Sequence, residues 1–139
     1  MKLIIINGPN LNLLGTRETS VYGTTSFNDF FNQLKKKYKN TVSLSFFQSN
    51  IEGELIDALQ EAAKNFDGVI LNAAAYTHTS IGIGDAVKAI KIPVVEVHIS
   101  NTFSREDYRH KSFISPSAKG VIVGFGLQSY ELAIDSFLK

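Results

Sequence analysis

Short runs of apolar residues alternate along the chain with longer segments in which apolar residues recur every three or four positions. The short runs are typical of buried strands, and they occupy residues 2–7, 41–47, 68–73, 93–100 and, with a closing turn, 119–126. The longer segments predict amphipathic helices at residues 26–39, 52–66, 80–90 and 127–138. This alternation predicts an α/β fold in three layers, a five-stranded parallel sheet with helices on both faces.

Two of the predicted helices show which side chains they bury. The helix at 26–39 is expected to bury one face, formed by Phe27, Phe30, Phe31, Leu34 and Tyr38. Ser26 is the expected N-cap, because a serine hydroxyl accepts a hydrogen bond from a first-turn N–H. The inward face of the helix at 52–66 is expected to hold Leu55, Ile56, Leu59 and Ala63.

Two segments have neither a helical nor a strand period. The first, "GTRETSVYG" at 15–23, sets Arg17 and Tyr22 between two glycines. It is either a surface turn or a lid that closes over a ligand and brings both side chains to it. The second segment, 101–118, is longer than most connections, and long connections in compact domains are often functional.

Composition narrows the class of protein. The 139 residues carry a net charge of +1, which argues against a nucleic-acid or anionic-membrane partner. No cysteine is present, so disulfides and thiolate chemistry are excluded. The apolar start is too short for a signal peptide, and no stretch approaches a membrane span of about 20 residues. With no repeat or linker in the sequence, we expect one domain over residues 1–139 in the cytoplasm.

Polar residues follow the predicted strands. The segments are NGPNLN at 7–12, QSNIEG at 48–53, NAAAYTHTS at 72–80, HISN at 98–101 and GFG at 124–126. Because ligands bind beyond the carboxyl ends of parallel strands, these segments predict a polar pocket at one edge of the sheet.

The fourth strand contains Glu96 and His98, two positions apart and therefore on one face. A buried carboxylate beside an imidazole is either a satisfied structural pair or a catalytic pair in which the carboxylate orients the histidine. The position of His98 at the strand exit favours catalysis. His78 is expected in a second loop of the same rim, and His110 is expected to be solvated.

Several other sites are not supported by the sequence. It holds no GxGxxG after the first strand and no GxxxxGK[ST], so no nucleotide cofactor is expected. Asn7 and Asn72 stand where response-regulator domains carry aspartates. The histidines have no familiar metal-ligand spacing, so no metal is expected either.

Taken together, the motifs resemble those of type II 3-dehydroquinate dehydratases over essentially the whole chain. They are NGPNLNLLGTRE…YG (7–23), QSNIEGE (48–54), LNAAAYTHTSIGIGDA (71–86), VEVHISN (95–101), RE…R (105–109) and GVIVGFG (120–126). The resemblance implies a flavodoxin-like fold and a dodecamer of four trimers. It also implies a cofactor-free dehydration of 3-dehydroquinate to 3-dehydroshikimate, in the shikimate pathway of aromatic amino acid biosynthesis.

The same resemblance implies roles in an anti elimination through an enolate. Tyr22 would take the proton from carbon 2, and Arg17 would keep its phenol ionised. Asn10 would hold a water on the enolate oxygen. His98, supported by Glu96, would protonate the departing hydroxyl at carbon 1.

Further residues would bind the substrate. Ile99 and Ser100 would hold its carboxylate through backbone N–H groups, aided by Asn72. His78 and Arg109 would grip ring hydroxyls, and Asp85 would reach the site of a neighbouring subunit.

One position departs from the family pattern, because Gly84 stands where the family often has arginine. The loss of that charge bears on the expected trimer contact. Two other classes of function stay open, a flavodoxin-like module that binds a small ligand without turnover and a shell subunit with a relic site.

Overall fold

The five predicted strands form one parallel sheet in the computed structural model, which describes residues 1–16 and 18–139. The strand order is β2-β1-β3-β4-β5, the order of flavodoxin-like folds. The strands are β1 (Lys2–Asn7), β2 (Ser43–Gln48), β3 (Gly68–Asn72), β4 (Val94–His98) and β5 (Gly120–Val123). The predicted fold class is therefore confirmed.

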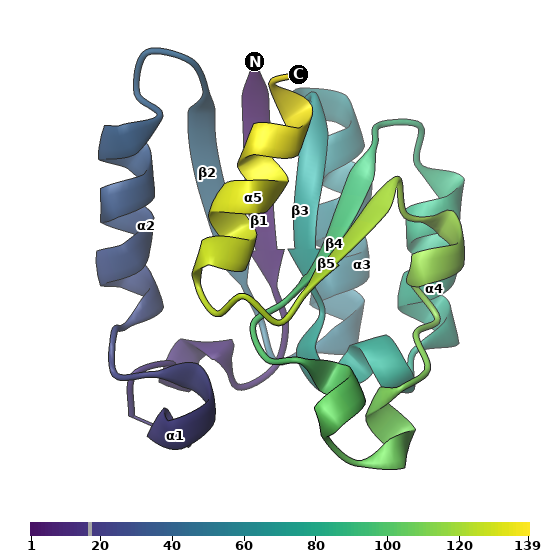
Figure 1. The fold of residues 1–139 in the computed structure, drawn as a ribbon. Coiled ribbons are helices and arrows are strands. Elements are labelled where there is room, and N and C mark those ends of the chain that lie inside the picture. The colour runs from purple at the N-terminus through teal and green to yellow at the C-terminus, as the bar shows by residue number, and fades with distance from the viewer. Residues whose placement is uncertain (17) are drawn as a thin grey trace.

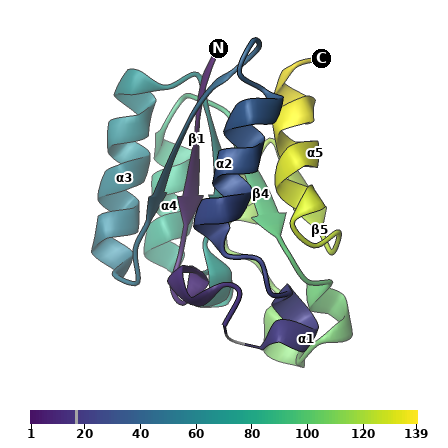
Figure 2. The same cartoon turned by 90° about the vertical axis from the view of Figure 1, so that its left-hand side faces the viewer.

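Helices cover both faces of this sheet, as predicted (Figures 1 and 2). One face packs against α2 (Phe27–Lys37) and α5 (Gln128–Phe137), and the other against α3 (Glu52–Asn65) and α4 (Ile81–Ala89). Alternate positions of β1 supply the two cores, since Leu3 and Ile5 join the α2–α5 cluster and Ile6 joins the α3–α4 cluster.

The local packing predictions are confirmed with small corrections. Ser26 accepts a hydrogen bond from the Asp29 N–H at 3.2 Å, and the five expected side chains of α2 are buried. In α3, Ala62 is buried, whereas Ile56 and Ala63, which were expected to face inward, are only half-buried. The second strand starts two residues later than predicted, because the N–H groups of residues 41 and 42 bond to the Tyr38 carbonyl in a turn.

The expectation that residues 15–23 hold no helix was wrong at four positions. Thr19–Tyr22 forms a single helical turn, α1, too short to leave a periodic pattern in the sequence. Glycines with positive φ lie at both ends of the segment, Gly15 at 96° and Gly23 at 82°. Segment 101–118 is irregular, as predicted, and contains short 3₁₀ helices at Thr102–Ser104, Asp107–Arg109 and Ser115–Ser117.

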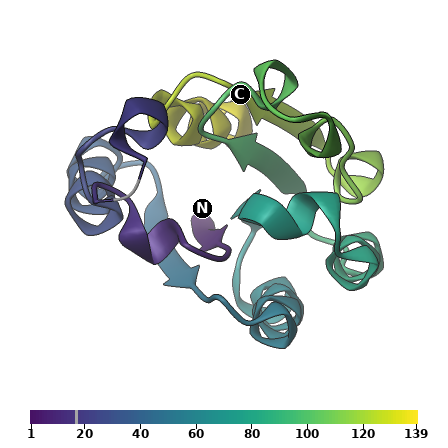
Figure 3. The same cartoon turned by 90° about the horizontal axis from the view of Figure 1, so that it is seen from below.

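Segment 15–23 and the first part of segment 101–118 lie at the carboxyl ends of the strands, the lower end in Figure 1 and the end that faces the viewer in Figure 3. The last residues of segment 101–118 run back beside α4 to the start of β5. The chain termini lie at the opposite end. At the site end the backbones of the central strands approach closely, since a Cβ on Gly8 would lie 2.5 Å from the Ala73 carbonyl oxygen. In the part of the chain that the structure describes, no helix is long and apolar enough to cross a membrane.

Candidate active site

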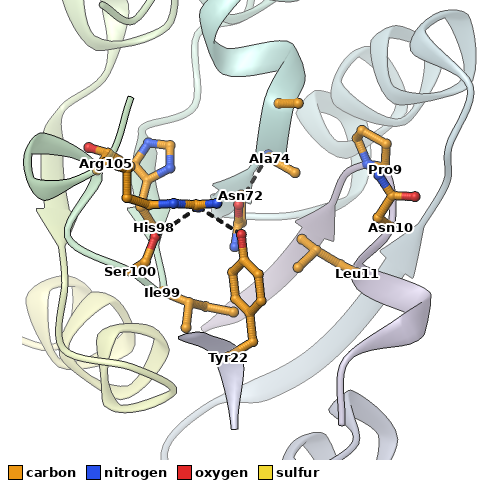
Figure 4. A pocket seen from close by; sticks show the side chains of 12 residues that line it. Pro9, Asn10, Leu11, Tyr22, Asn72, Ala74, His98, Ile99, Ser100 and Arg105 are labelled. Carbon is orange, nitrogen blue, oxygen red and sulfur yellow. Dashed lines mark hydrogen bonds between the residues drawn. The ribbon is translucent and has the colours of Figure 1, made fainter. Parts of the chain in front are cut away.

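A narrow cavity of about 50 Å³ lies where the loops after β1, β3 and β4 meet α1 (Figure 4). Its lining is Pro9, Asn10, Leu11, Tyr22, Asn72, Ala74, Ala75, His98, Ile99, Ser100, Thr102 and Arg105. Three of the five polar segments predicted at the strand ends, at 7–12, 72–80 and 98–101, contribute to this lining. The segments at 48–53 and 124–126 do not, so the predicted rim is confirmed only in part. We call this narrow space the lid cavity, because α1 and Tyr22 form one of its walls.

Tyr22 is held in the lid cavity by an arginine of segment 101–118. The Arg105 guanidinium donates a hydrogen bond of 2.8 Å to the Tyr22 hydroxyl and one of 3.2 Å to the Ser100 Oγ (Figure 4). The Arg105 side chain is only 15% exposed. The guanidinium therefore places a positive charge beside the phenol oxygen of Tyr22. The sequence prediction missed this role of Arg105, although it noted the RE…R motif.

Strained backbone supports another wall of the lid cavity. Ala74 has a φ of 52° and Asn10 a φ of 70°, both in the left-handed region that residues other than glycine rarely adopt. The Ala74 N–H donates to the Asn72 Oδ1 at 3.1 Å, and the Asn10 N–H donates to the Asn50 Oδ1 at 2.9 Å. Side-chain amides thus stabilise both strained turns.

A second cavity, of about 430 Å³, lies on the far side of His98. His98 lines both cavities, and we call the second the histidine cavity. Its other lining residues are His78, Glu96, Thr102, Phe103, Arg109, His110, Lys111, Ser112, Ser115, Pro116, Val121 and Val123. His110 is exposed, as expected, but it also borders this cavity, which the sequence did not predict.

The Glu96–His98 pair is buried, and the Glu96 carboxylate is hydrogen-bonded to three side chains. His98 Nε2 lies 2.5 Å from a Glu96 carboxylate oxygen, and the hydroxyls of Ser112 and Ser115 donate to the same carboxylate at 3.1 and 2.6 Å. Burial alone would raise the pKa of Glu96, but the hydrogen bonds from His98 and the two serines outweigh it, so this pKa is lowered. An ionised Glu96 fixes Nε2–H as a donor and leaves Nδ1 of His98 for other partners.

His78 stacks on His98 with ring centroids 6.1 Å apart. Its Nδ1 lies 2.7 Å from the Lys111 carbonyl, so Nδ1 carries the hydrogen and donates it. Burial lowers the pKa of His78 and outweighs that hydrogen bond. The ring is therefore neutral near pH 7, with Nε2 as an acceptor.

Other predicted residues lie further from the shared histidine. Arg109 borders the histidine cavity, and its Nε donates to Glu106 at 3.2 Å. Asp85 is exposed on α4 and lines neither cavity. Arg17 lies outside the described residues. Within residues 1–16 and 18–139, no group of three or more His, Asp or Glu side chains could hold a metal ion.

Apart from Asp85, the predicted site residues that the structure describes form two groups around His98. Those in the lid cavity are Asn10, Tyr22, Asn72, Ile99 and Ser100. Those in the histidine cavity are His78, Glu96 and Arg109. The arrangement offers a phenol next to a guanidinium and an imidazole next to a carboxylate, which are the components of proton transfer.

Fold and site together describe a flavodoxin-like α/β protein with a cluster of titratable side chains at the carboxyl edge of its sheet. Comparison with known families agrees, since residues 1–138 match the model of the family described as dehydroquinase class II. The chain belongs to this family.

Individual relatives agree with the family match. The chain is 53% identical over 135 residues to the 3-dehydroquinate dehydratase of Campylobacter lari, covering 96% of this chain and 84% of the relative. It is 51% identical to that of Prochlorococcus marinus strain MIT 9301, covering 99% and 95%. The crystal structure of type II dehydroquinase from Butyrivibrio crossotus is similar, with a TM-score of 0.97 at 44% identity, covering 100% of this chain and 98% of that one.

Proposed function

We propose that residues 1–139 form one catalytic domain that dehydrates 3-dehydroquinate to 3-dehydroshikimate in the shikimate pathway. Membership of the dehydroquinase class II family supports the reaction. The observation that carries the mechanism is that Tyr22, paired with Arg105, and His98, paired with Glu96, line one cavity. A base and an acid on a shared space suit an elimination that removes a proton and a hydroxyl group.

Tyr22 is the base in this proposal. Its phenolate takes the proton from carbon 2, next to the ketone, and the electron pair forms an enolate. The Arg105 guanidinium at 2.8 Å supplies a positive charge that favours the phenolate over the phenol. Arg17, five positions before Tyr22, is proposed to add a second positive charge when α1 closes over the substrate.

His98 is the acid. The enolate collapses, the bond from carbon 1 to its hydroxyl breaks, and the proton of the His98 imidazolium leaves with that hydroxyl as water. Glu96 stabilises the imidazolium, because its carboxylate is ionised and buried 2.5 Å from Nε2. The hydrogen bond from Nε2 leaves Nδ1 as the nitrogen that donates the catalytic proton.

The remaining residues hold the substrate. Asn10 is proposed to position a water on the enolate oxygen, and the backbone N–H groups of Ile99 and Ser100 to bind the carboxylate with Asn72. A neutral His78 accepts a hydrogen bond from a ring hydroxyl through Nε2, and Arg109 donates one. These two residues border the histidine cavity, so the substrate would span both sides of His98.

Asp85 is proposed to complete the site of a neighbouring subunit in a homododecamer of four trimers. Its exposure on α4 leaves it available for such a contact. We expect light scattering to give the mass of twelve chains and dissociated subunits to lose activity. An active monomer would contradict this assembly.

The cytoplasmic location of the protein also stays a prediction.

A direct assay tests the proposed reaction. Dehydration creates a carbon–carbon double bond conjugated with the ketone and carboxylate, so ultraviolet absorbance should rise when purified protein meets 3-dehydroquinate. A protein that binds this compound without any rise in absorbance would instead be a binding module.

A further inference from the structure

Tyr130 of α5 places a hydroxyl inside the molecule, at the ends of the two central strands. The side chain is completely buried, and its ring packs edge-on against Phe27 at 5.3 Å between centroids. The hydroxyl lies 2.8 Å from Asn72 Nδ2 and 2.9 Å from Asn7 Oδ1. Asn7 and Asn72 are register partners on β1 and β3, so Tyr130 bridges two neighbouring amides.

The hydrogen-bond partners fix the orientation of this chain of polar groups. The Ala74 backbone N–H can only donate, so the Asn72 atom that faces it at 3.1 Å is the oxygen. The Asn72 nitrogen then faces Tyr130 and donates to its hydroxyl. The hydroxyl must in turn donate its own hydrogen to the Asn7 oxygen. This order leaves Asn7 Nδ2 without a hydrogen-bond partner among the described residues.

This orientation decides what Asn72 offers to a ligand. Asn72 is only 4% exposed, and it lines the lid cavity between Tyr22 and His98. Its oxygen is engaged by Ala74, and one hydrogen of its nitrogen is engaged by Tyr130. The second hydrogen of the Asn72 nitrogen remains for a ligand, and this N–H is a donor suited to a carboxylate oxygen.

We propose that Tyr130 is a positioning residue that holds the Asn72 amide with its nitrogen ready for the substrate carboxylate. This inference rests on the proposed function, in which Asn72 helps to bind that carboxylate. Tyr130 itself lines neither the lid cavity nor the histidine cavity and acts only through Asn72. A purely structural Tyr130 would lower stability when changed but would leave substrate binding intact.

The first test is Tyr130→Phe, which removes the hydroxyl and keeps the ring. A carboxylate contact made in both the bound substrate and the transition state affects KM and not kcat. We therefore expect KM for 3-dehydroquinate to rise about tenfold and kcat to stay within about threefold.

Tyr38→Phe is the matched control. Tyr38 belongs to the same apolar cluster as Tyr130, and its hydroxyl donates to Asp135 at 2.7 Å, on α5. It borders neither cavity, so loss of this hydroxyl should lower stability and leave KM unchanged. Equal KM values for Tyr130→Phe and the unmodified enzyme would overturn the inference.

A double-mutant cycle tests whether Tyr130 acts through Asn72. Asn72→Ala should raise KM, and adding Tyr130→Phe to it should then have no further effect on KM. If Tyr130→Phe raised KM equally with and without Asn72, the inference would fail. If Asn72→Ala left KM unchanged, both the carboxylate role of Asn72 and the inference would fail, although dehydration itself would stand.

Asn7→Ala removes the acceptor of the Tyr130 hydroxyl at the other end of the same hydrogen-bond network. It tests whether this hydroxyl positions Asn72 even if Tyr130→Phe does not fold. Without its acceptor, the Tyr130 hydroxyl can donate to Asn72 Oδ1 once the amide turns over, so it no longer holds the amide in one orientation. KM should rise about threefold, less than for Tyr130→Phe, because the hydroxyl itself remains. An unchanged KM in Asn7→Ala would contradict the proposed network.

Discussion

The two sides of His98 are built in different ways. On one side, Tyr22 is half-buried on the single turn α1, between glycines with positive φ, and an arginine from another segment contacts its hydroxyl. On the other side, Glu96 lies in an interior strand, is 1% exposed, and accepts hydrogen bonds from His98 and two serines.

Tyr22 is therefore held by a short turn and by contacts from another segment, whereas Glu96 is part of the sheet itself. On the side of the proposed acid, the sheet and the two serine donors hold the Glu96 carboxylate in place without any substrate. The position of Tyr22, the proposed base, depends on a short segment and on side-chain contacts, which suits the proposed closure of α1 over the substrate. Variants on the two sides should therefore fail in different ways.

The largest effect is expected for Tyr22→Phe. Without the phenol oxygen no base remains, so kcat should fall by about 10⁴-fold, and raising the pH should not restore it. The absorbance assay measured across pH checks this. Tyr108→Phe is the control, since Tyr108 is 62% exposed and its hydroxyl bonds to Glu106. Substantial turnover by Tyr22→Phe would mean that the base lies elsewhere.

On the acid side, Glu96→Gln should lower kcat by about 10- to 100-fold, because a neutral amide stabilises the imidazolium less well than a carboxylate. Substrate binding should change little, since Glu96 is 1% exposed and its carboxylate is engaged by His98, Ser112 and Ser115. Steady-state kinetics separate the two effects. A large rise in KM with normal kcat would contradict the supporting role of Glu96.

Glu96 should also make stability depend on pH. Its pKa is lowered in the folded protein from the ordinary value of 4.5. Below 4.5 the unfolded chain therefore binds this proton more readily than the folded one, and the stability that the carboxylate contributes is lost as pH falls toward the lowered pKa. In urea unfolding measured across pH, the free energy of unfolding should fall more steeply below pH 4.5 for the unmodified protein than for Glu96→Gln. Parallel curves would show that the pair does not contribute in this way.

On the base side, Arg105→Ala should lower kcat by about 10- to 100-fold near neutral pH and recover part of it as pH rises. At high pH the phenol ionises without help, so the need for the guanidinium diminishes. Arg105→Lys should retain more activity than Arg105→Ala, although an ammonium lacks the planar fork that reaches both Tyr22 and Ser100. A pH profile of Arg105→Ala parallel to that of the unmodified enzyme would refute the role of Arg105.

Arg17 extends the same comparison. If it also acts on the phenol, Arg17→Ala should be impaired near neutral pH and recover as pH rises. The double variant with Arg105→Ala should then depend on pH more steeply than either single variant. An unchanged pH profile in Arg17→Ala would leave Arg105 as the sole activating cation of the proposed mechanism.

The smallest kinetic effect is expected at Gly84, where a Cβ would lie 2.4 Å from the Phe113 carbonyl oxygen. Gly84→Ala must push α4 away from the segment that carries Ser112 and Ser115. It should cost about 1–3 kcal/mol of stability and lower kcat less than tenfold. Gly82→Ala is the control, because its nearest neighbour is Ile56 Cδ1 at 3.4 Å and alanine favours helix by up to about 1 kcal/mol. Equal stability of the two variants in urea would contradict the close packing at Gly84.

The layered fold was readable from the sequence because parallel strands covered on both faces leave continuous apolar runs. Glu96 and His98 could be identified as candidates because they are polar residues inside an apolar run that predicts a buried strand. The helix α1 was missed because one turn carries no repeat. Its four residues are helical only in the context of the surrounding chain.

The contacts of Arg105 and Tyr130 depend on tertiary structure and could not be predicted. Arg105 lies in an irregular segment, and only the folded turns bring it 2.8 Å from a tyrosine 83 positions away. Tyr130 sits among the apolar residues of α5, where an aromatic side chain indicates a core position and nothing reveals the partners of its hydroxyl.

The most direct test of a separate base and acid is hydrogen exchange at carbon 2 of 3-dehydroquinate in heavy water. Removal of that proton by Tyr22 forms the enolate, and its return from a deuterated phenol leaves deuterium in unconverted substrate. We predict that His98→Ala, which dehydrates slowly, still incorporates deuterium at carbon 2, whereas Tyr22→Phe does not. Exchange by Tyr22→Phe, or its loss in His98→Ala, would contradict the division of the reaction between the two sides of the site.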